Sequence, residues 1–395
     1  MGKYKQVETI ISSLEKIIDS MKLNVFGLEE LENVKEATKE LNIFFYHVEE
    51  INIQKKYDMR IATEYSLYIK ELEELVQIWK KTICQRRKNK VDATFWEIYE
   101  YFKYVNVENI YQSVVQHFLR LPEAYRRQYV GLSSSYQFLK ATFDYTQNDY
   151  SLIRQHVELV AGSIERFRWL YEHLQDYRSK SVLNGILQYW FSFEFHYLEA
   201  INETIFLDYY DLDILECDSN TVMVDLGAFS GDSALDFVNT YKEFKKIYAY
   251  EITPSTYKVL VENVAEYKNI FPINKGVADV CKTMYVSGQE YGAANCLVNS
   301  DGEISIEVVT LDVDIKEPID VIKMDIEGAE KDALMGAKRH IKEDRPKLLI
   351  SAYHMPEDII EIPELIYSIR DDYKFYLRYN GGRQIWPSDY ILFAV

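Results

Sequence analysis

The feature that most constrains the fold is the stretch from Val222 to Asp232, which has the sequence VMVDLGAFSGD. Three apolar residues lead to an acidic residue and then to a loop with glycines at 227 and 231, a pattern that predicts a buried strand turning sharply into a helix. Glycine at these two positions allows positive φ and lets a ligand approach the main chain. The helix that begins near Ser233 directs free N–H groups into the same space. The stretch therefore predicts a nucleotide-binding loop.

Strands and helices alternate after this loop, which predicts a parallel sheet with helices on both faces. Beyond the first strand, the expected strands are Lys246–Glu251, Phe271–Val277, Asp320–Met324, Lys347–Tyr353, Phe375–Tyr379 and Ile391–Val395. The expected helices are Asp232–Tyr241, Pro254–Glu266, Ala329–Ile341 and one around Ile362–Arg370. Between Cys281 and Thr310 the alternation fails, and glycines separate short strands and loops that we expect above the sheet.

The first part of the chain is predicted to be helical, because seven of the eight prolines and ten of the fifteen glycines lie after residue 226. Apolar residues recur at three- and four-residue steps over 10–21, 34–48 and 61–83, and aromatic-rich segments follow at 94–119 and 152–174. We therefore expect an all-helical domain at 1–160, for substrate recognition or oligomerisation. A second domain at 161–395 would have a helical lead-in to about residue 218.

Composition excludes several classes of protein. The formal charge is −18, and nucleic-acid binding needs a clustered basic face. The one dense basic run, 86–90, is interpreted as a solvated helix end, with a nucleic-acid or lipid contact as the alternative. The four cysteines show no metal-binding spacing, and the first twenty residues contain no signal-peptide core or membrane span. We expect a cytoplasmic protein without a membrane span.

Carboxylates mark the ends of the first three strands, and ligands of open parallel sheets bind beyond these ends. Glu251 is expected to accept hydrogen bonds from ribose hydroxyls, with a solvated strand end as the alternative. Asp279 would face an adenine amino group or solvent, and Asp225 would steady the loop or bind a methionyl ammonium. Three acids on one rim thus predict a nucleoside site.

The fourth strand ends in the sequence KMDIEGAE, which places Lys323, Asp325, Glu327 and Glu330 within eight residues. Glu330 is interpreted as a helix cap or a partner of the helix dipole. Asp325 would hold the ammonium of a donor or the acceptor, and Glu327 would orient an acceptor hydroxyl. Asp325 and Glu327 are of the type that binds magnesium. Because the sequence shows no complete ligand set, no metal site is predicted.

His354 ends the fifth strand in the sequence SAYHMPED. Imidazole has a pKa suited to removing a proton from an alcohol, so His354 is either a general base or a structural histidine. His340 lies in a helix beside basic residues, where a solvated face is expected. Tyr353, Arg378 and Trp386 are weaker candidates for an acceptor pocket.

Several segments together resemble the FkbM-type S-adenosylmethionine-dependent methyltransferases. They are VDLGAFSGDS, YAYEITP at 248–254, VVTLD at 308–312, IDVIKMDIEGAE at 319–330, and a tail running from SAYH through IPELI to FYLRYN. The resemblance covers about residues 165–395. It implies a class I, Rossmann-like methyltransferase fold, an α/β architecture with a seven-stranded mixed sheet preceded by the helical domain.

The resemblance also implies O-methylation of a carbohydrate or natural-product hydroxyl, with S-adenosylmethionine as cofactor, in a bacterial protein. Aromatic content, including 33 tyrosines, suggests a surface glycan as acceptor, although codon usage explains the tyrosines equally well. The expected catalytic residues are His354, Asp325 and Glu327. The expected cofactor-binding residues are Asp225, Gly227, Ala228, Phe229, Gly231, Asp232, Glu251, Ile252, Asp279 and Asp325.

Two other functions fit parts of this pattern. An inactive donor-binding scaffold could dock partners or form a homo-oligomer through the helical first half. A nicotinamide-dependent sugar oxidoreductase is disfavoured, because the loop has the spacing Asp-x-Gly-x-x-x-Gly in place of the dinucleotide fingerprint. A small molecule or glycan, and no nucleic acid, is the expected partner.

Overall fold

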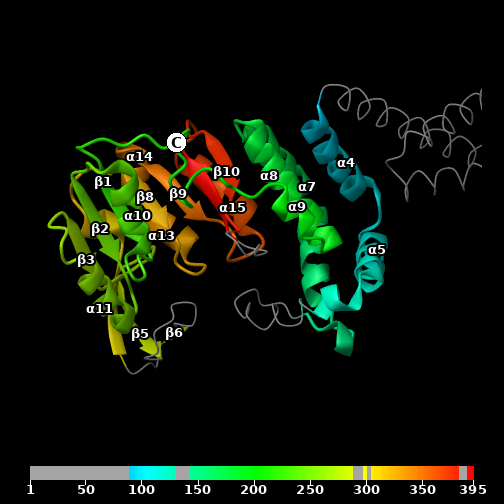
Figure 1. Cartoon of the computed structure of the whole chain (residues 1–395), viewed down its shortest axis with the longest axis horizontal. Helices are drawn as coiled ribbons and strands as arrows, with labels where there is room; N and C mark the ends of the chain where they lie inside the picture. The colour runs from blue at the N-terminus through cyan, green and yellow to red at the C-terminus, as the bar shows by residue number, and fades with distance from the viewer. Residues whose placement is uncertain (1–88, 128, 130–142, 288–296, 300–303, 382–388) are drawn as a thin grey trace, which may run out of the picture. The chain divides into compact units, whose positions relative to one another are not determined.

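The computed structural model describes residues 89–127, 129, 143–287, 297–299, 304–381 and 389–395 (Figure 1). The chain divides into two compact units, residues 1–113 with 160–164 and residues 114–159 with 165–395. The helices predicted at 10–21, 34–48 and 61–83 lie outside the described residues. A domain boundary near residue 160 stays a prediction. Among the described residues, none of the helices has the length and apolar character that a membrane span requires.

Helices occupy the described chain before the sheet. They are α4 (Lys90–Tyr104), α5 (Val107–Arg120), the 3-10 helix η2 (Tyr145–Gln147), α7 (Ser151–His173), α8 (Tyr177–Ser192) and α9 (His196–Glu199). Within the second unit, aromatic rings pack edge to face, with ring centroids 5.0 Å apart for Phe118 and Phe143 and 5.3 Å apart for Tyr129 and Phe193. These aromatic residues form a core, which accounts for part of the aromatic content without a ligand.

The main sheet has seven strands, as the sequence predicts. Its strands are β1 (Val222–Leu226), β2 (Lys246–Tyr250), β3 (Ile270–Ile273), β8 (Val321–Met324), β9 (Lys347–Ser351), β10 (Phe375–Tyr379) and β11 (Tyr390–Ala394). Their order is β10-β11-β9-β8-β1-β2-β3, and β11 runs antiparallel to both neighbours (Figure 1). The strand order reverses between β1 and β8, so the carboxyl ends of these two strands are the expected ligand site.

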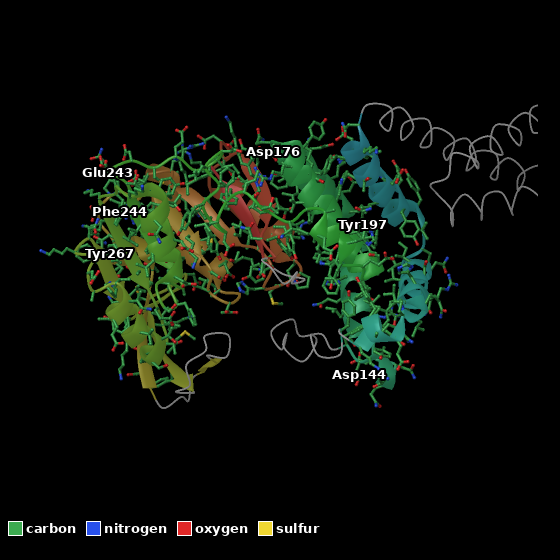
Figure 2. The ribbon with its side chains drawn as sticks, viewed as in Figure 1. Asp144, Asp176, Tyr197, Glu243, Phe244 and Tyr267 are labelled. Carbon is green, nitrogen blue, oxygen red and sulfur yellow. The ribbon has the colours of Figure 1, made fainter. Side chains whose placement is uncertain are left out.

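Both faces of the sheet are buried. On one face, Met223, Ile247 and Leu349 pack with Phe237 of α10 (Asp232–Tyr241) and Leu260 of α11 (Pro254–Asn263). Phe244 and Tyr267, labelled in Figure 2, pack against the margin of this cluster. Because side chains alternate along a strand, the equally buried Val224, Ile322 and Ile350 face the other side. This two-sided burial explains the continuous apolar runs of the sequence.

A second, four-stranded sheet lies where the alternation of the sequence fails. Its strands are β4 (Gly276–Val277), β5 (Lys282–Ser287), β6 (Leu297–Asn299) and β7 (Ile304–Val309), in the order β4-β7-β5-β6. The single strand predicted at Phe271–Val277 is therefore wrong, because β3 and β4 belong to different sheets. Between them, the amide Nδ2 of Asn274 donates to the carbonyl of Glu251 at 2.7 Å and turns the chain away from the main sheet.

The helix predicted at Ala329–Ile341 is also divided. The structure has α13 (Glu330–Gly336) and α14 (Lys338–Glu343), while α12 (Leu311–Asp314) precedes β8 and α15 (Asp358–Ile369) precedes β10. The carboxylate of Asp312 accepts the backbone N–H groups of Arg339 at 2.8 Å and His340 at 3.2 Å. Since these groups lie in the first turn of α14, Asp312 gives this helix a start of its own.

Helix α8 covers the edge strand β10. The hydroxyl of Ser179 accepts the N–H of Leu377 at 2.9 Å, and the side chain of Arg378 binds Asp211 at 2.6 Å and Asp176 at 2.8 Å. Asp176, labelled in Figure 2, also caps α8 through the N–H of Ser179 at 2.6 Å. Arg378 is 3% exposed and fully engaged in holding the lead-in to the sheet, which differs from its expected place in an acceptor pocket.

Candidate functional site

A cavity of about 1220 Å³ opens at the carboxyl ends of the central strands. The predicted residues that line it are Gly227, Phe229, Asp232, Glu251, Ile252, Asp325, Glu327 and Tyr353. The lead-in to the sheet contributes Asp208 and Tyr209, the second sheet contributes Lys282 and Met284, and the last loop contributes Asn380 and Asp389. The cavity therefore lies at the reversal of strand order, where the sequence analysis places the ligand.

The glycine loop bends sharply under one edge of this cavity. Gly227 has φ of 77°, and a Cβ atom added there would lie 1.8 Å from the carbonyl oxygen of Asp325. The N–H groups of Gly227 and Ala228 both donate to the carbonyl of Tyr250, at 3.0 and 2.9 Å. Gly231, with φ of 88°, is the N-cap residue immediately before helix α10. Only glycine fits the crossing of the two chain segments at Gly227.

Glu251 lies at the end of β2 and joins the loop to the next helix. One carboxylate oxygen accepts the N–H of Phe229 at 3.1 Å and the other accepts the N–H of Thr253 at 2.7 Å. Burial raises the pKa of Glu251 above its ordinary value, although these two N–H donors oppose the shift. Each carboxylate oxygen has two lone pairs, so both oxygens retain acceptor capacity towards the cavity.

Asp225 supports the glycine loop and does not itself line the cavity. It is fully buried, accepts the hydroxyl of Ser233 at 2.6 Å, and lies 3.1 Å from the ammonium of Lys323. Lys323 also donates to the carbonyl of Gly227 at 2.8 Å. Burial opposes the charged form of Lys323, but Asp225 and Asp325 raise its pKa. Of the two roles expected for Asp225, these contacts favour steadying the loop.

Asp325 follows β8 and presents its carboxylate to the cavity. It accepts the hydroxyl of Tyr209 at 2.9 Å, and the hydroxyl of Tyr353 lies 3.5 Å from its other oxygen. The hydroxyl of Tyr209 is also 2.9 Å from the hydroxyl of Ser351 at the end of β9. Asp325 is therefore oriented by side chains of two segments, the lead-in to the sheet and the end of β9.

Three carboxylates surround the side chain of His354, which is 2% exposed. Nδ1 lies 3.0 Å from Oε1 of Glu330, and Nε2 lies 3.4 Å from Oδ1 of Asp325 and 3.5 Å from Oε2 of Glu327. Burial alone would lower the pKa of His354, but Glu330, Asp325 and Glu327 raise it to about 9. Asp325 and Glu327 line the cavity and His354 lies behind them. We call these four residues the His354 cluster.

The backbone before α13 is unusual at this cluster. Glu327 has φ of 56° and Gly328 has φ of 96°, so two consecutive residues adopt left-handed conformations. Residues other than glycine adopt such conformations at a cost and often do so at functional sites. Glu330 accepts the N–H of Ile326 at 2.9 Å, which closes this turn. Glu330 is the first residue of α13, where its charge can interact with the helix dipole, whereas the N-cap position is occupied by Ala329.

Several expected residues lie elsewhere. Asp279 is exposed, and Ala228 and Gly231 support the loop without lining the cavity. Trp386 lies outside the described residues. The solvated position expected for His340 is wrong: this residue is 0% exposed, because Nδ1 contacts Asp344 at 2.5 Å and Nε2 contacts the carbonyl of Ile315 at 3.1 Å.

The sequence analysis missed Asp208 and Tyr209 as site residues. Their segment is recognisable only as an acidic stretch before the first strand, and nothing in the sequence places it beside β8. Burial raises the pKa of Asp208, as do the charges of Asp236 and Asp232. The excess of acidic groups at the cavity favours a ligand that carries positive charge.

Comparisons with known proteins agree with this architecture. Residues 225–379 match the model of the Methyltransferase FkbM domain. The chain contains an FkbM-type methyltransferase domain. A crystal structure of Methyltransferase FkbM from Methylobacillus flagellatus KT is 25% identical, with a TM-score of 0.53. That match covers 61% of this chain and 62% of the other chain, which is less than two thirds of either. The predicted class I methyltransferase fold is thereby confirmed.

Other solved structures resemble the FkbM domain less closely. An rRNA methylase from Streptococcus thermophilus has 17% identity and a TM-score of 0.28, with 45% of this chain and 87% of that chain covered. Fibrillarin from Aeropyrum pernix, with S-adenosyl-L-methionine natively bound, has 15% identity and a TM-score of 0.31, with 50% of this chain and 73% of that chain covered. No curated protein sequence matches the chain.

Proposed function

We propose that this protein transfers a methyl group from S-adenosylmethionine to a hydroxyl of a carbohydrate, such as a surface glycan. The observation that carries the donor assignment is the junction of Glu251 with the glycine loop, at the reversal of strand order. There a buried carboxylate, the N–H of Phe229 and the tight bend at Gly227 border one cavity. The matched FkbM domain agrees with this donor.

The donor end of the cavity fits an adenosyl compound. The two oxygens of Glu251 can each accept a further hydrogen bond, as the two ribose hydroxyls require. The bend at Gly227, where the chain has no room for a Cβ atom, lets a ligand approach the main chain. Asp208, Asp232 and Asp325 supply negative charge for the sulfonium and ammonium groups of the donor.

S-adenosylmethionine supplies an activated methyl group, so the protein mainly has to align the acceptor and remove its proton. Asp325 and Glu327 line the cavity and can accept a hydrogen bond from an acceptor hydroxyl. The imidazole of His354 contacts the carboxylates of Asp325 and Glu327. We assign acceptor binding and proton removal to the His354 cluster. The resemblance to FkbM-type enzymes supports a sugar hydroxyl as acceptor.

Calorimetry with S-adenosylhomocysteine tests the donor site. We expect saturable binding to the wild-type protein and at least tenfold weaker binding to Glu251→Gln, because one buried charged acceptor is worth about 1.5–3 kcal/mol. Glu317→Gln is the matched control, because Glu317 accepts hydrogen bonds from Lys246 and Tyr248 at the opposite end of β2. Equal affinity in wild-type protein and Glu251→Gln would refute the donor site.

The acceptor is tested by incubating the protein with isotope-labelled S-adenosylmethionine and glycan extracts. Mass spectrometry should locate the label on a sugar oxygen. Donor binding without transfer to any glycan would favour the inactive scaffold. Binding of NAD in place of S-adenosylhomocysteine would favour the oxidoreductase.

A further inference from the structure

We infer that Asp325, Glu327 and His354 bind a divalent metal ion such as Mn²⁺ at the acceptor end of the cavity. The first observation is the spacing of three donor atoms. Nε2 of His354 lies 3.4 Å from Oδ1 of Asp325 and 3.5 Å from Oε2 of Glu327. Both distances are long for hydrogen bonds. Metal–ligand bonds of about 2.1 Å at tetrahedral or octahedral angles would separate neighbouring donor atoms by about 3.0–3.4 Å.

The second observation is how the histidine is held. Nδ1 of His354 lies 3.0 Å from Oε1 of Glu330, and this contact directs Nε2 towards Asp325 and Glu327. Metal-binding histidines usually donate their other ring N–H to a carboxylate, and Glu330 is the carboxylate that lies beside Nδ1 of His354. Glu330 is itself fixed by the N–H of Ile326 at 2.9 Å. Glu330 is therefore the positioning residue, and the other three residues are the ligands.

The third observation is that no lysine or arginine of the described residues forms an ion pair with the three carboxylates, which share the imidazole of His354. Oε2 of Glu330 is buried and has no hydrogen-bond partner among the described residues, and it belongs to the carboxylate that contacts His354. Lys323 and Lys331 flank the cluster in sequence, but Lys323 binds Asp225 and Lys331 binds Asp358 and Glu361. Asp325 and His354 belong to a group whose ligand atoms lie within 4.8 Å of one another, and the third member of that group is Glu330, the residue that holds His354. A divalent ion would add positive charge where three carboxylates share one imidazole.

The ligand set indicates the kind of ion. Carboxylates suit Mg²⁺ and Mn²⁺, whereas imidazole suits transition metals, so two carboxylates with one imidazole favour Mn²⁺ over Mg²⁺. Asp325 and Glu327 line the cavity, which leaves coordination positions open to a substrate oxygen. A bound ion would stabilise negative charge developing on that oxygen. This chemical role rests on the proposed function, but binding of the ion does not.

The test is titration of the full-length protein with Mn²⁺ after treatment with a chelator, with free Mn²⁺ measured by electron paramagnetic resonance. We expect one ion per chain, and at least tenfold weaker binding to Glu327→Gln and His354→Ala. Glu330→Gln should weaken binding tenfold to a hundredfold, roughly the range for partners of metal-binding histidines. Asp332→Asn is the matched control, because it removes another carboxylate from the same cavity. It should change the affinity less than twofold.

Absence of saturable binding up to about 1 mM Mn²⁺, where weak carboxylate sites already bind their ions, would overturn the inference. So would wild-type affinity in Glu327→Gln, or an equal loss in Asp332→Asn, which would indicate only general attraction of cations. Glu327 is partly exposed, so Glu327→Gln remains informative if His354→Ala does not fold. Binding of S-adenosylhomocysteine to the same samples is measured separately. Loss of one activity with retention of the other shows which proposal has failed.

Discussion

Two buried histidines lie at opposite ends of the main sheet. His340 lies near the amino ends of β8 and β9, and His354 follows the carboxyl end of β9. His340 has both ring nitrogens in contact with the fold, one with Asp344 at 2.5 Å and the other with the carbonyl of Ile315 at 3.1 Å. His354 instead faces three carboxylates, two of which line the cavity.

The difference separates a network that is satisfied within the fold from one that borders the cavity. At the amino ends, Asp344 also accepts the N–H of Ile319 at 3.2 Å, and Glu317 is shared by Lys245 and Lys246. Each acid there has partners within the fold. At the carboxyl ends, three carboxylates share the single imidazole of His354. Clusters of charged groups with perturbed pKa values are typical of ligand sites.

The largest loss of stability is expected at Gly227, where the glycine loop crosses the chain at Asp325. In Gly227→Ala, the new Cβ atom would lie 1.8 Å from the carbonyl of Asp325, and φ of 77° is unfavourable for alanine. We expect a loss of more than about 4 kcal/mol in the free energy of unfolding, or failure to fold. Urea unfolding measures it. Gly162→Ala is the control, because nothing lies within 4 Å of the added atom and Gly162 is within α7. A small effect at Gly227 would contradict the crossing.

Two lysine variants test whether buried charge is confined to the carboxyl ends of the strands. Lys323→Met leaves the fully buried Asp225 without its cation, which should cost about 3–5 kcal/mol of unfolding free energy. Lys246→Met removes the partner of Glu317 at the amino end of β2, where the lysine side chain is 26% exposed. Such an exposed pair is worth about 0–1 kcal/mol. Urea unfolding of both variants gives the comparison, and equal losses would contradict it.

The sequence predicts the carboxyl ends of the strands better than the amino ends. Buried parallel strands appear as apolar runs, and each run ends in a polar residue at the ligand edge, so Gly227, Glu251 and Asp325 could be found from local pattern alone. The burial of His340 could not, because Asp312 and Ile315, which hold its helix and ring, lie more than twenty residues earlier. Neither could the place of Tyr209, which depends on how the lead-in folds back against β8.

Some boundaries failed for a related reason. A pattern of apolar residues shows that a helix continues, but it does not show that a side chain from another segment caps it, as Asp312 does for α14. Likewise, the run through β3 and β4 is continuous in hydropathy, although Asn274 turns the chain into a second sheet. Secondary structure follows from local pattern, whereas these breaks follow from tertiary hydrogen bonds.

The two histidines give the next prediction, measured by thermal unfolding with and without Mn²⁺. His340→Ala should lower the free energy of unfolding by about 2–4 kcal/mol, because it removes a buried ring together with its contacts to Asp344 and to the carbonyl of Ile315. It should retain the stabilisation by Mn²⁺, which is about 2.7 kcal/mol at one hundred times the dissociation constant. His354→Ala should lose that stabilisation. If His340→Ala lost the stabilisation by Mn²⁺ and His354→Ala retained it, the assignment of His354 as the metal ligand would be contradicted.

The smallest expected effect is a pH dependence that distinguishes the two ends of β2. Burial raises the pKa of Glu251, and ribose binding needs its unprotonated oxygens, so affinity for S-adenosylhomocysteine should fall as the pH drops through this raised pKa. The affinity should therefore begin to fall at a pH above the ordinary pKa range of glutamate. At pH values below the raised pKa of Glu251, it should fall about tenfold per pH unit. The pKa of Glu317 is lowered to about 2 by Lys246, so Glu317→Gln should leave the profile unchanged. Calorimetry between pH 8 and pH 5 should show this decline in wild-type protein and not in Glu251→Gln, and identical profiles would exclude Glu251 as the titrating group.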